Sequence, residues 1–476
     1  MKRQNVQDSE FTLLFEPVMS GGGAVRLIDH SRNRESNVKV AVDDRAFSYR
    51  VQKEFPSIIA DLTDLSIAIH AADRLTFQSL RQHQTWLHVV LPARHPELLN
   101  QNPLQNKLSD LLEWATGSRW VFEFSKRVDS GRAVEQQPLL APADPYVDEV
   151  ALWSGGLDAL AGLYTHLKEN PKISFMLFGT GSNDNAYARQ EQVFQALQPS
   201  FPNRLNLCRA PIRFSESNSH TKNKISRARG IVFMLLGSAC AYLMGQRVLH
   251  LYENGIGAIN LPYRKSAVGL DHSRSVHPLT LLGVGNLISE LIGEEFRVRN
   301  PFLFWTKAEM CQQLAKDAKY ELPALTISCD SPHRKQPIQC GYCSSCILRK
   351  QALAASRVKD QTHYIVPHGT RPVGDIRLYI QHMLAQVSTL KGLLKYSENT
   401  TAQWESLTKR FPELDDIVDR THEGEGLTSL EMRKCLIRLY QTYVSEWDTV
   451  EPQISGDFLN QVSNQQVSQD FQLAIQ

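Results

Sequence analysis

Residues 149–158 read EVALWSGGLD, and this stretch decides the fold. The run EVALW is typical of a buried strand, and the residues after Asp158 follow helical spacing. Between them, Gly155 and Gly156 allow a tight turn that approaches a phosphate closely, while Ser154 and the free N–H groups of the new helix donate to it. Asp158 then stands where a carboxylate holds Mg²⁺. The structural alternative is an ordinary strand-to-helix turn whose aspartate only caps the helix.

Strands and helices alternate outward from this turn. Such alternation predicts an α/β fold with a parallel sheet covered on both faces, whose ligands bind beyond the carboxyl ends of the strands. The expected strands are 149–153, 173–179, 205–212 and 248–255, and the expected helices are 158–168, 187–197 and 229–244.

The flanks of this segment have other patterns. Short β-like runs and helical stretches at 61–75 and 104–116 predict an α+β module at the N-terminus. The glycine run at 20–23 lies between two strand patterns with no helix after it, so we interpret it as a hairpin turn and not a phosphate loop. Apolar residues after 360 recur at helical spacing. The predicted organisation is an N-terminal α+β module (1–140), a proline-bearing linker (128–148), an α/β domain (147–358), a helical C-terminal region (359–460) and a mobile tail (461–476).

Composition narrows the class of protein. A length of 476 residues predicts about three folding units. Lys plus Arg is 52 and Asp plus Glu is 50, so the net charge of +2 supplies no broad field for nucleic acid or an anionic membrane. We therefore expect no nucleic acid as direct substrate. The uncharged run 230–246 is too short to cross a membrane, and no secretory signal is visible, so we expect a cytoplasmic protein.

Four of the eight cysteines form a metal-binding pattern. Cys329, Cys340, Cys343 and Cys346 are separated by ten, two and two residues. Four thiolates complete a tetrahedral Zn²⁺ shell with no open position, so the site is expected to be structural. An iron–sulfur cluster and His333 in place of Cys329 are the alternatives. The other cysteines, Cys208, Cys240, Cys311 and Cys435, are interpreted as isolated core residues.

Three motifs occur together in one order: SGGLD at 154–158, Thr-Lys-Ala-Glu at 306–309, and Cys…CGYCSSCILR at 329–349. Their order and spacing resemble the QueC family of 7-cyano-7-deazaguanine synthases, PP-loop ATP-pyrophosphatases with a HUP/Rossmann-like sheet, over about 149–355. The long flanks resemble those of the QueC-like proteins of bacterial anti-phage systems, QatC and its type IV CBASS counterpart. The stretch 61–74 looks like their N-terminal module.

The resemblance implies an adenylating ligase. Such enzymes use ATP and Mg²⁺ to activate 7-carboxy-7-deazaguanine, release pyrophosphate and form an amide. It further implies that Ser154, Gly155, Gly156 and Asp158 hold the pyrophosphate and its magnesium, that Leu152 and Trp153 line the nucleotide side, and that Arg227, Arg229 and Lys307 contact phosphate. Structural alternatives stand beside the last three, because arginines can solvate a helix end and Thr306 to Glu309 forms a capping box.

The substrate pocket is expected near the fourth strand of the α/β domain. There Glu253, Asn254, Asp271 and His277 stand in place of the family's usual residues. A carboxylate such as that of Glu253 can accept from a guanine-like N1–H and the exocyclic amine together. A surface loop with scattered polar groups is the alternative.

The resulting hypothesis is an ATP-dependent carbon–nitrogen ligase in antiviral defence. The amine acceptor is ammonia or an amine of a partner protein. A tRNA-thiolating PP-loop enzyme is the first rival, but dispersed cysteines and near-neutral charge argue against it. A non-catalytic nucleotide-binding scaffold is the second, favoured by Ala159 where the family's loop usually has Ser.

Overall fold

The computed structural model describes most of the chain. The described residues are 9–18, 22–44, 46–47, 55–76, 85–128, 131–136, 147–181, 184–214, 226–263, 274–330, 337–370, 372–395 and 399–455. Within them, the strands are β1 (Phe11–Pro17), β2 (Gly22–Asp29), β3 (Arg34–Val42), β4 (Trp86–Ala93), β5 (Arg119–Lys126), β6 (Glu149–Leu152), β7 (Phe175–Gly181), β8 (Leu205–Phe214), β9 (Val248–His250) and β10 (Arg297–Arg299).

The helices of the described residues fall into three groups, those of the N-terminal module, the α/β domain and the C-terminal region. They are α1 (Ser57–Leu75), α2 (Pro96–Leu99) and α3 (Asn102–Thr116); then α4 (Leu157–Glu169), α5 (Asp184–Leu197), α6 (Arg229–Leu243), α7 (Gly255–Ile259), α8 (Pro278–Ile292), α9 (Lys307–Lys316), α10 (Glu321–Leu325) and α11 (Ser344–Ala355); and finally α12 (Arg377–Lys395), α13 (Thr400–Arg410), α14 (Glu413–Thr421) and α15 (Ser429–Ser455).

The strands of the described residues form one ten-stranded, mostly parallel sheet in the order β10-β9-β6-β7-β8-β3-β2-β1-β4-β5. The α/β prediction is confirmed: β6, β7, β8, β9 and β10 run parallel with helices between them. The fourth predicted strand is shorter than expected, because pairing stops at His250 and α7 begins at Gly255. The carboxyl end of β6 therefore leads directly into the glycine turn.

The N-terminal module joins this sheet through β3. Val40 to Val42 pair antiparallel with residues 212–214 of β8. The expected hairpin is present, since β1 and β2 pair antiparallel from Phe11–Asp29 to Pro17–Gly23. Gly22 and Gly23 are the first residues of β2, and 19–21 lie outside the described residues. The sheet thus crosses the predicted boundary between module and α/β domain, which the strand patterns did not indicate.

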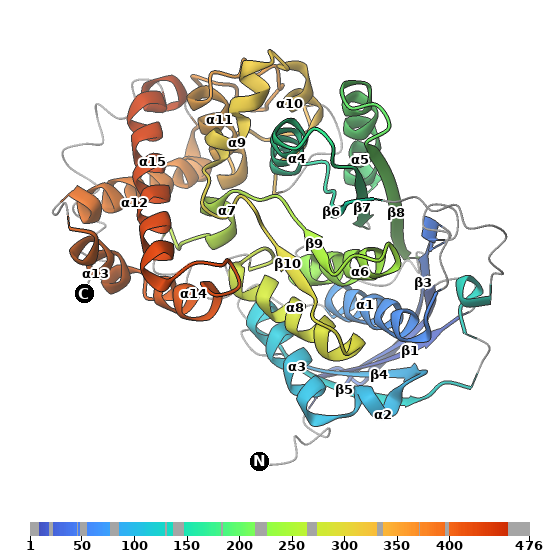
Figure 1. Cartoon of the computed structure of the whole chain (residues 1–476). Helices are drawn as coiled ribbons and strands as arrows, with labels where there is room; N and C mark the ends of the chain where they lie inside the picture. The colour runs from blue at the N-terminus through green and yellow to red at the C-terminus, as the bar shows by residue number, and fades with distance from the viewer. Residues whose placement is uncertain are drawn as a thin grey trace.

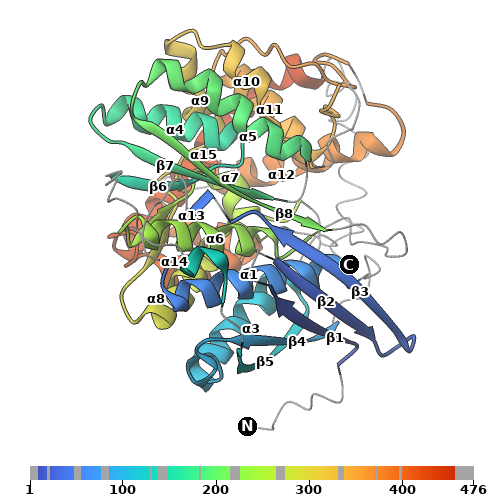
Figure 2. The ribbon, with the colours of Figure 1, turned by 90° about the vertical axis from the view of Figure 1, so that its right-hand side faces the viewer.

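Helices fill the space between the two halves of the sheet. In Figures 1 and 2, α6 and α8 lie beneath β6–β8, and α1 and α3 lie between them and β1–β5. The helices α4 and α9 cover the opposite face of β6–β8. The first hydrophobic core spans the module's strands together with α1, α6 and α8, so module and α/β domain share one interior.

The helical C-terminal region packs on one side of the α/β domain. Helices α12–α15 build a second core around Leu407, Leu436 and Trp447, and α15 also packs against α11 and α7 (Figure 1). The expected mobile tail, 461–476, lies outside the described residues. No helix in the described part of the chain is long and apolar enough to span a membrane.

Candidate functional site

The glycine turn places one exposed hydroxyl at the start of α4. Ser154 is exposed, and its Oγ accepts from the N–H of Gly156 at 3.2 Å. The preceding Trp153 is fully buried, with its Nε1 donating to the carbonyl of Gln190 at 2.8 Å, and Leu152 is also buried. The predicted turn is therefore present. Leu152 and Trp153 anchor it in the core, and Ser154 is its accessible polar side chain.

Gly155 is required by the geometry of this turn. Its φ of +72° lies in the left-handed region, where a Cβ is disfavoured. A Cβ at this position would also stand 2.9 Å from the backbone nitrogen of Gln190 in α5. The turn thus packs directly on α5. Both the left-handed backbone and this close contact restrict the position to glycine.

Asp158 lies at the centre of a compact polar cluster. Its Oδ2 is 2.7 Å from Nζ of Lys307, the first residue of α9, and its Oδ1 accepts from Nδ2 of Asn254 at 2.9 Å. The same Nδ2 lies 2.8 Å from Oε1 of Glu253. Asp158, Glu253 and Lys307, predicted from three separate segments, are thus brought together. Lys307 also fulfils the capping alternative, because Thr306 and Glu309 form the predicted capping box.

Two ionisable groups of this cluster are strongly shifted. Burial, and then the charge of Asp158, raise the pKa of Glu253 to about 8. Burial alone would lower the pKa of Lys307, but the carboxylates of Asp158 and Glu253 outweigh it and raise that pKa. At neutral pH, one ammonium therefore faces one carboxylate and one largely protonated carboxyl group.

Asn300 is a residue of this site that sequence analysis missed. Its side chain clamps the backbone of Glu253: Oδ1 accepts from the Glu253 N–H at 3.2 Å, and Nδ2 donates to the Glu253 carbonyl at 2.8 Å. The side chain is buried. An asparagine just after a short strand gives no pattern that distinguishes this role from a turn residue.

Of the other predicted phosphate and substrate residues, Arg227, Arg229 and His277 lie in the described part of the chain, at the starts of α6 and α8. Arg227 donates to the carbonyl of Thr116 in α3, and Arg229 begins α6 with an exposed side chain. His277 is a buried N-cap of α8, whose Nδ1 accepts from the N–H of Leu279. Burial, and then the charge of Arg274, lower the pKa of His277 to about 3, which keeps this acceptor neutral. Asp271 and the alternative ligand His333 lie outside the described residues.

The four predicted metal ligands converge. The Sγ atoms of Cys329, Cys340, Cys343 and Cys346 all lie within 4.8 Å of one another. The Cys340–Cys346 and Cys329–Cys343 separations are 3.8 and 4.0 Å, close to the edge of about 3.8 Å in a tetrahedron with 2.3 Å Zn–S bonds. The N–H of Cys343 also points at Sγ of Cys340 at 3.3 Å, which favours a thiolate. This donor set fits a structural metal such as zinc.

The remaining cysteines are not all isolated, contrary to the interpretation of the sequence. The thiol of Cys240 in α6 contacts that of Cys208 in β8, and this contact together with burial raises the pKa of Cys240 well above its usual value. Both side chains have no exposed surface. A buried thiol with a raised pKa is unreactive, so the pair does not support the thiolating rival. Cys311 is buried in α9, within range of the charges of Asp158 and Lys307, and Cys435 is half-buried in α15.

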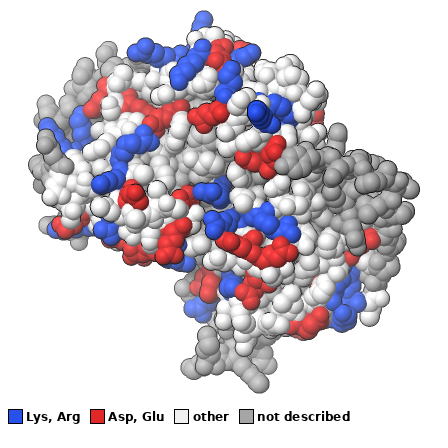
Figure 3. Space-filling view, viewed as in Figure 1, with Lys and Arg blue, Asp and Glu red and all other residues white. Residues whose placement is uncertain are grey.

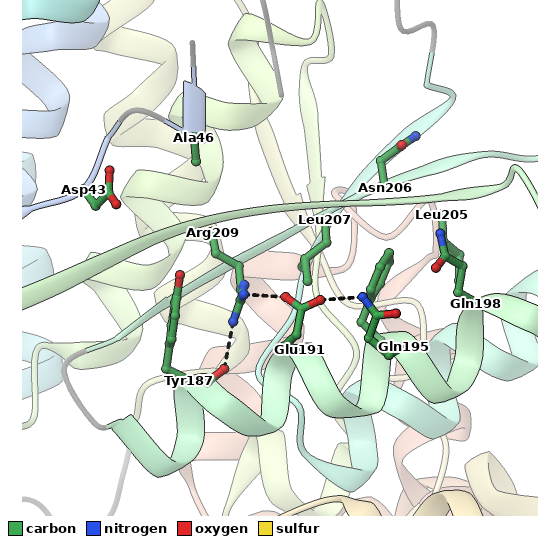
Figure 4. Close-up of a pocket in the computed structure, with 11 residues that line it drawn as sticks. Asp43, Ala46, Tyr187, Glu191, Gln195, Gln198, Leu205, Asn206, Leu207 and Arg209 are labelled. Carbon is green, nitrogen blue, oxygen red and sulfur yellow. Dashed lines mark hydrogen bonds and ion pairs between the residues drawn. The ribbon is translucent and has the colours of Figure 1, made fainter. Parts of the chain in front are cut away.

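A polar cavity of about 720 Å³ lies between α5 and β8. Figure 4 shows Arg209 between the ring of Tyr187 and the carboxylate of Glu191. The guanidinium carbon is 4.2 Å from the ring centroid, and the guanidinium pairs with Glu191. Because these two charges neutralise each other, the cavity offers no free charge to an anion. Its lining shares no residue with the Asp158 cluster.

Charges of both signs are interspersed over the face seen in Figure 3. Blue and red side chains alternate there around a pale central area, without a continuous basic stripe. Among the residues described on this face, none form the continuous basic patch that marks a tRNA-binding protein.

Comparison with known proteins finds a family match over the segment that contains the four cysteines. Residues 277–357 match the family model described as queuosine biosynthesis protein QueC. Over 138 residues the chain is 28% identical to the 7-cyano-7-deazaguanine synthase of Pseudomonas aeruginosa, covering 29% of this chain and 57% of the relative. The corresponding synthase of Cellvibrio japonicus is also 28% identical over 138 residues, with 56% of its length covered. The chain thus spans little more than half the length of these curated relatives, and the matches support a QueC-like domain.

Proposed function

We propose that this chain is a cytoplasmic, QueC-like ATP-dependent ligase that adenylates 7-carboxy-7-deazaguanine or a related carboxylate. The observation that carries the proposal is the ion pair between Asp158 and Lys307, 2.7 Å apart. It joins the SGGLD turn to the first residue of the second motif. The third motif supplies the four cysteines within the segment that matches QueC.

The cluster suits the charge that develops when pyrophosphate leaves. The exposed Ser154 and the first N–H groups of α4 can donate to phosphate oxygens at a helix N-terminus. Lys307 supplies a fixed positive charge in a largely buried setting, where electrostatic stabilisation is strong. Asp158, and Glu253 once it has given up its proton, are the carboxyl groups that would hold Mg²⁺, which when bound neutralises charge on the phosphates.

The proposed reaction has two steps. A carboxylate oxygen of the substrate attacks the α-phosphorus of ATP, and the bond from that phosphorus to the bridging oxygen breaks as pyrophosphate leaves with its electrons. An amine nitrogen then adds to the acyl carbon, loses a proton and displaces AMP to leave an amide. Where the amine is ammonia, the oxygen of the resulting primary amide would attack the α-phosphorus of a second ATP and release a second pyrophosphate. Loss of AMP and of both N–H protons would then give the nitrile of 7-cyano-7-deazaguanine.

The test is pyrophosphate release from magnesium ATP, with and without 7-carboxy-7-deazaguanine and before any amine is added. We expect substrate-dependent release that falls about 10²–10³-fold in Asp158→Asn, because a charge partner of the phosphate site is lost. Asp419→Asn makes the same chemical change on the exposed face of α14 and should leave release unchanged. No release from folded, zinc-loaded protein would contradict the proposal and favour a nucleotide-binding scaffold.

The finer proposal concerns the amine and the setting. We infer that the acceptor is an amine of a partner protein in an antiviral defence system, with ammonia as the alternative. The helical C-terminal region and the N-terminal module, which pack closely on the α/β domain, support it by offering surface for such a partner. Partner proteins recovered with the enzyme should carry a mass adduct of deazaguanine size. Adduct-free partners would leave ammonia as the acceptor.

A further inference from the structure

Helix α15 holds both residues of the capping box that begins α9. Within that box, Oγ1 of Thr306 accepts from the N–H of Glu309 at 3.1 Å. The same hydroxyl donates to Oε1 of Glu446 in α15. Eight residues earlier on α15, Arg438 places NH1 2.5 Å from Oε1 of Glu309 and bonds the carbonyl of Phe304 through NH2. The helix start that presents Lys307 is therefore fixed from α15 at two points.

Glu446 also connects this helix start to the helix of the four-cysteine segment. Its second oxygen, Oε2, accepts from Nε2 of Gln351 in α11 at 2.9 Å. Glu446 thus bridges α9 and α11 with one carboxylate, and both oxygens are used.

The segment that carries Glu253 and Asn254 also packs against α15. Gly255 follows Asn254 and starts α7. A Cβ on Gly255 would stand 2.6 Å from Cδ2 of Leu439 in α15 and 2.0 Å from the carbonyl of Leu303. The chain after Asn254 therefore approaches α15 as closely as a glycine allows. Both segments that meet Asp158 rest on the same helix.

We propose that α15 is a positioning element of the Asp158 cluster, and that Glu446 acts through Thr306 to fix Lys307 against Asp158. This inference rests on the proposed function and adds to it a role for the C-terminal region. Lys307 immediately follows Thr306, so a shift of the Thr306 hydroxyl moves the backbone that carries the ammonium. Because displacement of a catalytic group by about 1 Å can cost 10²-fold in rate, this support matters for chemistry more than for substrate binding.

The experiment compares three variants of the full, zinc-loaded chain. Glu446→Ala removes both contacts. Glu446→Gln keeps an acceptor for Thr306, and its new N–H₂ can donate to Oε1 of Gln351, which has no hydrogen-bond partner among the described residues. Asp448→Ala is the matched control. Asp448 lies on α15, as Glu446 does, and its replacement removes only an exposed ion pair with Lys391 of α12.

Two readouts are taken. The first is kcat and KM for ATP in pyrophosphate release with 7-carboxy-7-deazaguanine. The second is the labelling rate of Lys307 by an amine-reactive reagent, followed by peptide mass spectrometry, which does not require activity. We expect Glu446→Ala to lower kcat about tenfold or more with KM changed less than about twofold, and to label Lys307 severalfold faster. Glu446→Gln and Asp448→Ala should behave as the wild type.

The proposal is overturned if Glu446→Ala matches Asp448→Ala in labelling of Lys307 and, where release is measurable, in kcat. If the wild type releases no pyrophosphate, the proposed function fails, while the labelling rates still decide whether α15 fixes Lys307. Should Glu446→Ala fail to fold, Glu446→Asp withdraws the carboxylate by one methylene and is judged by the same two readouts.

Discussion

Glu253, Asp158 and Lys307 form a set of charges that balances only if one carboxyl keeps its proton. Two carboxyl groups share one ammonium in a largely buried region. Because burial and the charge of Asp158 raise the pKa of Glu253 to about 8, Glu253 is the carboxyl that stays protonated near neutral pH.

This proton makes stability depend on pH with a definite sign. An acid whose pKa is raised in the folded protein binds more protons folded than unfolded between its unfolded pKa, about 4.3, and its folded one. Its stabilising contribution is complete below that window and is lost as pH rises through it to about 8. In Glu253→Gln, the fall in unfolding free energy over pH 5–8 should be shallower by up to about 1.4 kcal/mol per pH unit. Urea unfolding at several pH values measures it.

Glu405→Gln is the control, because Glu405 is an exposed carboxylate of α13. Its pH profile should parallel that of the wild type. Parallel profiles for wild type and Glu253→Gln as well would show that Glu253 does not hold the proton.

At the residue scale, the sequence predicted which residues carry the chemistry, but it did not predict which of them contact one another. SGGLD placed Asp158 at a helix start and the capping box placed Lys307 at another, because both signals are local. Nothing local indicates that residues so distant in sequence form an ion pair. His277 shows the converse: the sequence suggested substrate binding or a surface loop. In the structure His277 is buried, and its Nδ1 accepts from the N–H of Leu279, so that it caps α8.

At the element scale, the glycine turn and the four-cysteine segment each begin a helix. Gly156 is the N-cap of α4, and Cys343 is the N-cap of α11. Both helix starts lack a side-chain cap in the described structure. The first N–H groups of α4 are therefore open to another partner, phosphate in our proposal. At α11, the N–H of the N-cap residue Cys343 itself points at Sγ of Cys340.

Gly155→Ala tests whether the turn is built for close approach. Gly293 has nearly the same φ, +71° against +72°, but a Cβ there would meet nothing within 4 Å. Both alanine variants should lose about 1 kcal/mol from the left-handed backbone. Gly155→Ala should lose more, because its Cβ meets the backbone of α5, and it alone should weaken ATP binding. Chemical denaturation and ATP titration give the two values; equal losses with unchanged ATP affinity would argue against a constrained turn.

Cys343→Ser tests the metal. With one of four thiolates removed, we expect the bound zinc to be lost and the unfolding free energy to fall by roughly 4 kcal/mol or more. Elemental analysis and thermal unfolding measure both. Cys435→Ser, outside the cluster, should keep full zinc and near-normal stability. Iron with sulfide in the purified wild type would identify the cluster as iron–sulfur instead.

At the scale of the whole molecule, the sheet is continuous from β5 to β10, and this was the main feature the sequence did not predict. Alternation along β3 shows which of its faces is buried: Val38, Val40 and Val42 point inward. It does not show which strand lies beside it, since pairing depends on backbone groups that every residue has. The helical pattern of α15 likewise predicted a helix but not that Glu446 would reach Thr306.

Because the N-terminal module and the α/β domain share a sheet and a core, we expect them to unfold as one cooperative unit. Asp73 in α1 ties them further, since its Oδ2 accepts from the N–H of Ala228 at 3.2 Å and from the hydroxyl of Ser226. Asp73→Ala should lower the opening free energy of β3 and of β8 equally, by about 1–3 kcal/mol. Native-state hydrogen exchange with mass spectrometry reports both strands.

The control for this measurement is Glu35→Ala, which removes only an exposed pair with Arg26. It should change neither strand by more than about 1 kcal/mol. Separate opening free energies for β3 and β8, with Asp73→Ala affecting one alone, would mean that the two parts unfold independently.

Because β3 pairs with β8, β3 must wait for its partner strand while the chain is synthesised on the ribosome. At about 5–20 residues per second, β8 is completed roughly 10–35 s after β3. For that time the nascent chain carries β3 without its later neighbour, as an open edge. The exposed residues of β3 include Arg34, Glu35 and Lys39, and charges on an edge strand discourage pairing with a second nascent chain on the same message.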